Sequence, residues 1–571
     1  MKKYLAYIIL TISLLALISA ATADSVNFVV TGITGPLLDN ILTKLSDQAA
    51  QEKPLTPKNI IHLYRNAPLL IQQAIEPFGY FSSKVYASGL HQPKRDDWEA
   101  HFEVVPGAPI RIKQINITFS GPGQDDPTLH KLQKNFPIKV GEIFSSDQYE
   151  AARDLLLQTA NNRGYVKSVL TEKKVFIDKE NFSAVITLHL ETGSQYYFGE
   201  ATFNQTSFDP NFLKRFISFF PGESFSSDKL LKMQEDLNNS HYFQQVTISP
   251  QMEKAKARHI PVEIHLTLPK AKRYTFGVGY GTFTGPRATF GVDYRRVGHS
   301  GRHFSVLARV SSELSGLSGK YFIPGPNPLT DQYILGAEIQ KFSPNNGESY
   351  SENLSASAVK TIHDWQHTLS LNYLIERYEV VNNPTESSLL LYPSYTLSWI
   401  HADDLINPQN AKVLNFTIKG ASDKILSHTT FIQGEIKGKY IFSPIENGRV
   451  ILRADLGYTV VNDLLTLPLT LRYFAGGLGS VRGYSYSSIG PGRYLETASV
   501  ELQHRIYGDL SAGIFYDVGT ATNHFNDRLY RGEGVGLIYN SPIGPIQVYV
   551  ARAMSLPGHP ARVEFSIGPD L

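Results

Sequence analysis

The chain has 571 residues, no cysteine and a net charge of +2, from 54 basic and 52 acidic residues. The charge balance excludes a protein built around a broad nucleic-acid-binding face, and the lack of cysteine excludes disulfide scaffolds, thiolate metal sites and cysteine nucleophiles. The 31 Tyr, 31 Phe and 44 Gly, against 3 Trp and 4 Met, favour strands and turns.

The N-terminus has the features of a secretory signal peptide. Lys2 and Lys3 precede an apolar stretch over residues 5–18, which is followed by the small-x-small site Ala21-Thr22-Ala23. This pattern predicts a signal peptide over residues 1–23 and export of the mature chain. An N-terminal anchor helix is the alternative, which the short apolar run and the cleavage-like site disfavour.

A seven-residue loop sequence occurs twice in the first half, about 80 residues apart. The segments 141–147 (GEIFSSD) and 222–228 (GESFSSD) share six of seven residues. Their Ser and Asp side chains are typical helix N-caps, and apolar residues at helical spacing follow the first segment. This first helix is expected to stop at Gly164, a candidate left-handed residue.

A tripeptide with tyrosine in the middle follows each predicted helical region, and a predicted strand begins after it. The three copies are Gly79-Tyr80-Phe81, Gly164-Tyr165-Val166 and His241-Tyr242-Phe243. Together with a leading and a closing strand, the repeat unit reads as strand, two helices and two strands. We therefore predict three small α+β (βααββ) modules over residues 24–107, 108–194 and 195–269, each with a helical layer on one sheet face and an open sheet edge.

From Arg273 onward the sequence alternates with a period of two. One face carries Tyr274, Phe276, Val278 and Tyr280, and the other carries Thr275, Gly277, Gly279 and Gly281. Soluble sandwiches also alternate, but export and the persistence of the pattern favour a membrane barrel. Residues 270–571 are enough for a 16-stranded antiparallel transmembrane β-barrel, at about 19 residues per strand with its connection.

Sixteen strands enclose a lumen too wide for wall side chains to fill, so the lumen either conducts or holds a plug. The longest predicted connection, from Asn462 to about Gly492, follows the eleventh strand and contains Phe-Ala-Gly-Gly-Leu-Gly-Ser-Val-Arg-Gly-Tyr at 474–484. This segment resembles the inserted-loop motif of the BamA/TamA superfamily, outer-membrane barrels with periplasmic POTRA modules that insert or export proteins. The resemblance implies that the motif Val481, Arg482, Gly483 and Tyr484 folds into the lumen against inner-wall partners at Glu501, Phe515, Asp517 and Gly519.

The chemistry of these residues fits that role. A guanidinium keeps its charge inside a barrel and offers a planar fork to a carboxylate, for which Asp517 and Glu501 are the candidate acceptors. Gly483 permits a tight turn, and Tyr484 adds a packing surface with one polar group. The alternative is an ordinary exposed loop with an arginine at its tip.

Within the superfamily the chain is most similar to the TamA branch. Three modules, the segment 534–545 (GVGLIYNSPIGP) and the ending 566–571 (SIGPDL) carry this similarity, although Leu571 replaces the terminal aromatic residue of many outer-membrane barrels. The BamA branch has five modules, and two-partner secretion transporters have two. The resemblance implies a bacterial outer-membrane location with periplasmic modules, contact with outer-membrane lipid, and a TamB-like, inner-membrane-anchored, periplasm-spanning partner. It also implies client outer-membrane β-barrel or autotransporter polypeptides.

The seam where the first and last strands meet is predicted to be weak. Its residues are Gly277, Gly279 and Gly281 on the first strand and Phe565, Ile567 and Gly568 on the last. Glycine adds little packing, and Pro569 cannot donate to a ladder. A client strand could pair with the opened edges, although the glycines could instead relieve crowding or permit curvature.

The leading hypothesis is an outer-membrane assembly factor that inserts or secretes clients by opening this seam. A polypeptide secretion pore of the two-partner type and a general BamA-type insertase are the alternatives. The sequence contains no Gly-x-Ser-x-Gly elbow and no His-Glu-x-x-His motif, so no enzyme activity, metal or cofactor is predicted.

Overall fold

The computed structural model describes residues 25–52, 55–94, 97–205, 207–281, 285–381, 383–525, 527–542 and 544–567. The predicted signal peptide, residues 1–23, lies outside the described residues. The described residues form two compact units: the first two modules with part of the third, and the rest of the third module with the barrel. Among these residues, no helix combines the length and the apolar character needed to cross a membrane.

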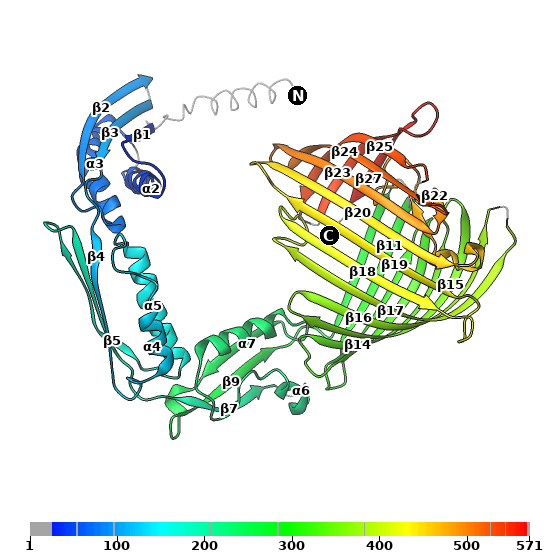
Figure 1. Cartoon of the computed structure of the whole chain (residues 1–571), viewed down its shortest axis with the longest axis horizontal. Helices are drawn as coiled ribbons and strands as arrows, with labels where there is room; N and C mark the ends of the chain where they lie inside the picture. Colours follow the sequence, from blue (N-terminus) through cyan, green and yellow to red (C-terminus); the bar gives the residue numbers. More distant parts are fainter. Residues whose placement is uncertain are drawn as a thin grey trace, which may run out of the picture. The chain divides into compact units, whose positions relative to one another are not determined.

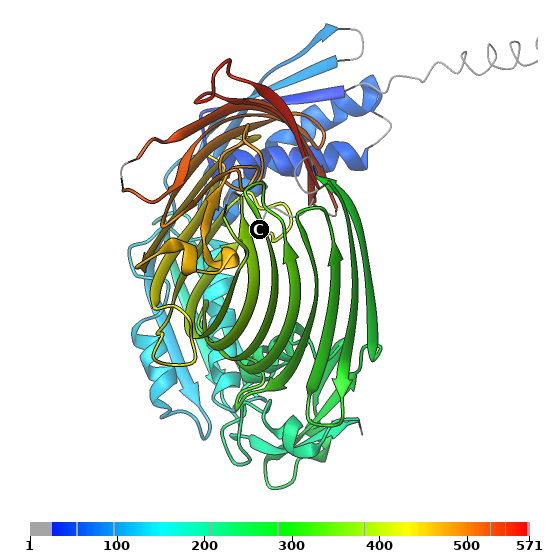
Figure 2. The same ribbon diagram turned by 90° about the vertical axis from the view of Figure 1, so that its right-hand side faces the viewer.

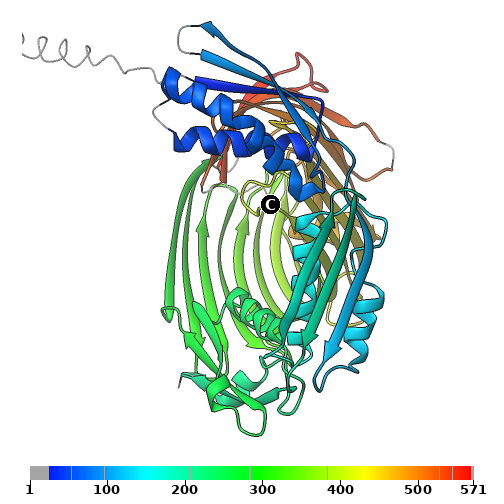
Figure 3. The same cartoon turned by 90° about the vertical axis from the view of Figure 1, so that its left-hand side faces the viewer.

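The first module is a three-stranded sheet with two helices on one face (Figure 3). In this sheet the first strand pairs in parallel with the third, and the second pairs antiparallel with the third. The helices bury apolar side chains such as Ile41, Ile71 and Ile75 against the sheet. The elements are β1 (Ser25–Thr31), α2 (Pro36–Gln51), α3 (Pro57–Ile75), β2 (Lys84–Lys94) and β3 (Asp97–Val105).

The second module repeats this order with its own core. Its elements are β4 (Arg111–Ser120), α4 (Pro127–Lys134), α5 (Ser146–Asn162), β5 (Val169–Asp178) and β6 (Ser183–Glu191). The repeated loop caps α5 as predicted, because the Ser145 side chain accepts a hydrogen bond from the Gln148 backbone N–H at 3.4 Å. The helix ends at Asn162 and Gly164 is left-handed, with φ of 88°, which confirms the predicted stop.

Asp126 joins the two helices of the second module. Its carboxylate accepts from the Thr128 backbone N–H at 2.8 Å, the Arg163 guanidinium at 3.1 Å and the Tyr165 hydroxyl at 3.4 Å. Burial raises the pKa of Asp126, but the hydrogen bonds from Thr128 and Arg163 outweigh it, so the net pKa lies below the ordinary value. The carboxylate form therefore stabilises the module.

The third module completes the predicted set of three. Its elements are β7 (Tyr197–Asn204), α6 (Pro210–Lys214), α7 (Ser227–Asn239), β8 (Gln245–Pro250) and β9 (His259–Thr267). The second copy of the repeated loop also caps a helix, since the Ser226 hydroxyl accepts from the Lys229 backbone N–H at 3.3 Å. The strand order is again first, third, second in all three modules.

The second half forms the predicted 16-stranded antiparallel barrel (Figure 1). Its outer face is apolar, and Tyr274, Phe276 and Val278 are 58, 78 and 92% exposed. The strands are β10 (Lys272–Gly281), β11 (Gly285–Val297), β12 (Arg302–Val310), β13 (Leu314–Pro324), β14 (Asp331–Phe342), β15 (Gly347–Ile362), β16 (Trp365–Val380), β17 (Glu386–Ala402), β18 (Ala411–Ala421), β19 (Phe431–Phe442), β20 (Gly448–Val461), β23 (Tyr494–Tyr507), β24 (Leu510–Thr522), β25 (Tyr530–Ser541), β26 (Gly544–Ala553) and β27 (Ala561–Ile567).

The sheet begins with β10 and ends with β27, and these two strands lie side by side (Figure 2). Every other neighbouring pair of barrel strands is joined by an antiparallel ladder, but no ladder joins β10 to β27 within the described residues. This boundary is the seam. Over the described part of the two strands, the barrel is therefore closed by contact at the seam rather than by backbone pairing.

The connection after the eleventh barrel strand occupies the predicted position. It spans residues 462–493 and is called the lumen loop below. It contains η3 (Leu464–Thr466), η4 (Leu469–Leu471), β21 (Tyr473–Ala475) and β22 (Ile489–Gly492). Since the strands run alternately up and down, this loop leaves the wall at the end opposite to the one where the chain enters β10.

Candidate functional site

The first limb of the lumen loop is fixed to the inner wall at β16. The buried Glu376 carboxylate accepts hydrogen bonds from the Thr470 backbone N–H at 3.0 Å and from the Thr470 hydroxyl. On the same strand, the Tyr378 hydroxyl donates to the Leu465 carbonyl at 2.8 Å. The Arg472 guanidinium donates to the same carbonyl, also at 2.8 Å. These contacts hold the loop inside the barrel before it reaches the motif.

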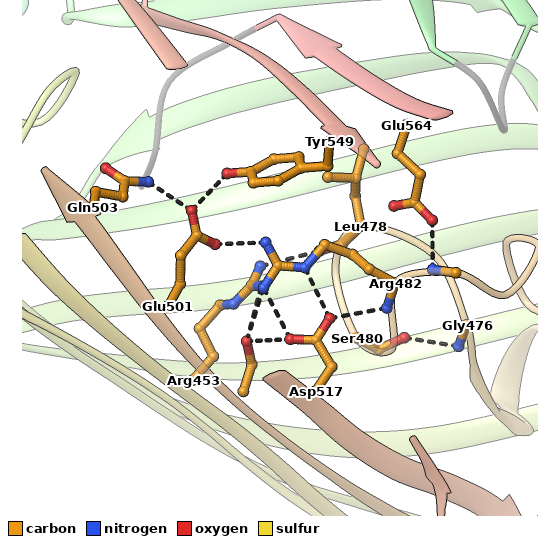
Figure 4. A network of polar contacts seen from close by, with 12 residues as sticks. Arg453, Gly476, Leu478, Ser480, Arg482, Glu501, Gln503, Asp517, Tyr549 and Glu564 are labelled. Carbon is orange, nitrogen blue, oxygen red and sulfur yellow. Dashed lines mark hydrogen bonds and ion pairs between the residues drawn. The ribbon is translucent and has the colours of Figure 1, made fainter. Parts of the chain in front are cut away.

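The tip of the loop is the motif Val481–Tyr484, and its arginine is held by two carboxylates (Figure 4). Arg482 is only 1% exposed. Its Nε and Nη2 atoms donate to the Asp517 carboxylate of β24 at 2.8 and 2.9 Å, and its Nη1 donates to Glu501 of β23 at 2.5 Å. The Arg482 backbone N–H also donates to Asp517, at 2.9 Å. The planar fork thus binds both acids at once, which an ammonium group cannot do.

Two aromatic rings enclose the guanidinium. The ring centres of Phe515 and Tyr549 lie 3.5 and 4.9 Å from the Arg482 guanidinium carbon. The Tyr549 hydroxyl also donates to the Glu501 carboxylate at 2.6 Å. Because aromatic faces attract cations, the rings add to the ionic attraction and exclude water from it.

The tip is also bound to the last strand of the barrel. The Gly483 backbone N–H donates to the Glu564 carboxylate of β27 at 2.6 Å. Gly483 has a φ of 91°, and a Cβ on it would lie 2.8 Å from the backbone carbon of Arg552, so a side chain is excluded for two reasons. Beside it, the buried Tyr484 hydroxyl donates to the Arg531 carbonyl at 3.1 Å.

Glycines on the inner face of β25 make the space for the tip. A Cβ on Gly532 would lie 2.0 Å from the Arg482 carbonyl oxygen. A Cβ on Gly534 or Gly536 would lie 2.7 or 2.3 Å from the rings of Phe515 and Tyr549. The glycines of this strand therefore serve as the seat of the loop and its two enclosing rings.

The structure brings most of the predicted loop residues together. Val481, Arg482, Gly483 and Tyr484 meet Glu501, Phe515 and Asp517 at one place, with Phe515 acting through its ring. Gly519 differs from the prediction. A Cβ on Gly519 would meet Glu496 and Thr497 of the neighbouring strand rather than the loop, so its absence allows β23 and β24 to pack.

The predicted seam residues form a separate group. Gly277, Gly279 and Gly281 belong to β10, and Phe565 and Ile567 belong to β27. Gly568 lies outside the described residues. Two neighbours of this group on β27 link it to the loop: Glu564 accepts from the Gly483 backbone N–H, and Nη1 of Arg562 donates to the Ser485 hydroxyl at 2.7 Å. The Glu564 side chain is buried, whereas that of Val563 beside it is exposed.

Sequence reasoning missed Glu564 and Tyr549. The alternation at the end of the chain places Glu564 on the inner face of the last strand, and an inward acid there is the signal that could have indicated a loop contact. The two missed residues oppose each other in the β26–β27 ladder. The nearby Arg453 was missed as well; its guanidinium donates to the Leu478 carbonyl of the loop at 3.0 Å.

The arrangement fastens the loop tip to the barrel wall, and it is called the clamp below. The loop tip contacts Glu501 of β23, Asp517 of β24, the Arg531 carbonyl of β25, the Tyr549 ring of β26 and Glu564 of β27, so it ties five strands together from inside. Within the described ranges, no three His, Asp or Glu side chains are grouped in a way that could hold a metal ion. The clamp braces the wall that ends in β27 and leaves β10 outside it.

Comparison with known proteins gives three family matches. The model of the Omp85 superfamily domain matches residues 270–570. The model described as POTRA domain TamA domain 1 matches residues 27–106. A POTRA model described as surface antigen variable number repeat matches residues 110–193 and 196–267.

Curated relatives and a solved structure agree with these matches. The outer membrane protein assembly factor BamA of Nitratidesulfovibrio vulgaris is 21% identical over 527 residues, which are 85% of this chain but only 65% of that protein. BamA of Neorickettsia risticii is 22% identical over 523 residues, 83% of this chain and 68% of that protein. The chain thus spans about two thirds of the length of these relatives. The crystal structure of BamA from Haemophilus ducreyi lacking POTRA domains 1–3 has the same fold, with a TM-score of 0.68 at 16% identity over 80% of this chain and 99% of that one.

Proposed function

Since this chain belongs to the Omp85 superfamily, we propose that it assembles proteins at the outer membrane, inserting or secreting β-barrel clients by opening the seam between β10 and β27. It is an outer-membrane protein, with its POTRA modules in the periplasm and its barrel in the membrane. The observation that carries the proposal is the missing ladder between the two end strands within the described residues. The proposed function involves no catalysis.

An open seam presents two rows of backbone N–H and C=O groups at membrane depth. Each unpaired group costs several kcal/mol in hydrocarbon, so the edges must pair with something. A β-strand of a client satisfies them by augmentation and is held in the membrane plane as a result. Because the loop tip braces β23 to β27, opening is expected to move β10 rather than β27.

The finer proposal is a TamA-type role with autotransporters among the clients. The match of the first module to the POTRA domain TamA domain 1 model supports it. This role calls for a TamB-like partner that is anchored in the inner membrane and reaches the modules across the periplasm. Purification of the full chain from outer membranes tests it: a large inner-membrane-anchored partner supports the TamA-type role, and lipoproteins of the general assembly machine would favour the BamA-type role.

The seam mechanism is tested by tethering. The chain has no cysteine, so one engineered cysteine in β10 and one in β27 form a unique pair. The matched control is Ser357→Cys with Ser370→Cys, which face each other in the β15–β16 ladder with their hydroxyls 2.8 Å apart. Directly opposed residues lie about 4.5–5.5 Å apart, a separation that a disulfide tolerates.

We expect the oxidised seam pair to block insertion of a client barrel into vesicles and reductant to restore it, while the control pair has no effect. Full activity with a completely locked seam would overturn the mechanism. Secretion through the lumen is the competing function, and it predicts continued export with the seam locked. The tightly bound loop tip disfavours it, because Arg482 would have to leave both carboxylates for the lumen to clear.

A further inference from the structure

A side-chain hydrogen bond between described residues crosses the seam. Arg287 of β11 lies directly opposite Gly279 in the β10–β11 ladder, and its Nη2 atom donates to the backbone carbonyl of Ile567 on β27 at 2.8 Å. The side chain therefore passes over the whole width of β10 to reach the strand beyond it. The acceptor is a backbone oxygen of the end strand, in a region where no ladder is described.

Gly279 makes this crossing possible. A Cβ on Gly279 would lie 2.7 Å from Nε of Arg287 and 3.3 Å from its Cγ, so any other residue would occupy the path of the guanidinium. Gly277 and Gly281 share the same inner face of the strand. The lack of a side chain at Gly279 thus leaves the space in which the Arg287 side chain lies across β10.

The Arg287 guanidinium can dissociate from the Ile567 carbonyl at low cost. Within the described residues it forms no ion pair, and its bond to Ile567 is the one hydrogen bond of its side chain, although a guanidinium carries five N–H donors. The Arg287 side chain is exposed. A charged donor on a neutral carbonyl in contact with water is a contact of modest strength, which can be exchanged for water without leaving a buried charge behind.

We propose that Arg287 is the latch of the seam: it positions β27 against β10 across Gly279, and its release must precede pairing of a client strand with β10. The role of the latch in client pairing rests on the proposed function, whereas the contact of Arg287 with Ile567 does not depend on it. Losing the latch increases the population of the open seam while leaving the clamp on the loop tip intact.

Hydrogen–deuterium exchange of the full chain in lipid nanodiscs tests the latch without any client. Arg287→Ala is expected to speed exchange of the amides in β10 and β27 about three- to tenfold, because each end strand has a ladder on one side only and separates from it more readily once the contact across the seam is lost. Gly279→Val is expected to do the same with Arg287 still present, since its side chain blocks the path. The matched control is Arg309→Ala, an exposed arginine of β12 that lies opposite Thr289.

Exchange in Arg287→Ala equal to that in the control variant would overturn the latch, as would wild-type exchange in Gly279→Val. Folding of each variant is checked by protection of β15 and β16, far from the seam. Client insertion into vesicles is measured in parallel. Faster exchange with unchanged insertion would support the latch and count against seam opening as the function, so the two ideas fail separately.

Discussion

Replacing Arg482 with lysine isolates the role of the guanidinium fork. The substitution keeps the positive charge beside Asp517 and Glu501 but replaces four side-chain hydrogen bonds, three of them to carboxylate oxygens, with a single ammonium. The two carboxylates lie on different strands, so one ammonium can serve only one of them well. The other is left buried without its partner.

The loss in the free energy of unfolding can be worked out from the number of hydrogen bonds removed. About two charge-assisted hydrogen bonds are lost, each worth roughly 1.5–3 kcal/mol. The resulting range of about 3–6 kcal/mol includes the roughly 3–5 kcal/mol that breaking a buried ion pair from one side costs. The loss of stacking between Phe515 and Tyr549 adds to it. We therefore expect Arg482→Lys to lower the free energy of unfolding of the barrel by about 3–5 kcal/mol.

Equilibrium urea unfolding in lipid vesicles measures this change through the fluorescence of Trp365 and Trp399, which stack in the barrel wall. The control is Arg505→Lys, an exposed position on β23. A double-mutant cycle with Asp517→Asn should be strongly non-additive, since the two changes remove the same contacts. A loss below about 1 kcal/mol, or additive effects, would refute the assignment of tip binding to the fork.

Three further predictions concern other parts of the chain. Gly532→Val should push the carbonyl of the motif arginine out of its seat and expose the loop tip to trypsin, whereas Gly438→Val on β19, with nothing within 4 Å, should not. Glu376→Ala should free the Thr470 limb of the loop and raise conductance in planar bilayers, because both carboxylate oxygens that accept from Thr470 are lost; unchanged conductance would contradict this. The stability that Asp126 confers should be present above about pH 4 and lost as pH falls through its lowered folded-state pKa; acid unfolding followed by circular dichroism should lose this component in Asp126→Asn.

The fold was predictable because its signals are local and repeated. Ser145 of the loop 141–147 is the N-cap of the helix that follows, and that helix ends just before Gly164, which is left-handed. Alternation over Tyr274 to Tyr280 fixes the outer face of the first barrel strand. Such patterns depend on neighbours in the chain, so no knowledge of distant contacts is needed to interpret them.

The site was only partly predictable because its contacts join distant segments. The motif and the Asp517 segment carry recognisable sequences, but Glu564 is 81 residues from Gly483 and belongs to no motif. Arg287 is 280 residues from Ile567, and its bond depends on the barrel bringing the first and last strands together. The glycines of β10 were interpreted as a loss of packing, whereas at Gly279 the missing side chain makes room for a specific contact.

The two arginine contacts differ in a way that decides which side of the seam moves. Both arginines lie against strands bared by glycine: the backbone of Arg482 lies against Gly532, and the side chain of Arg287 lies across Gly279. Arg482 is buried and bound to two carboxylates, so its release leaves uncompensated charges and costs several kcal/mol. Arg287 is exposed and bound to one carbonyl, so water replaces its partner at a cost of about 1 kcal/mol. If the seam opens as proposed, thermal opening is therefore expected to break the Arg287 contact far more often than the Arg482 contact. We expect the strand set free to be β10, while β27 stays fixed to the loop through Glu564.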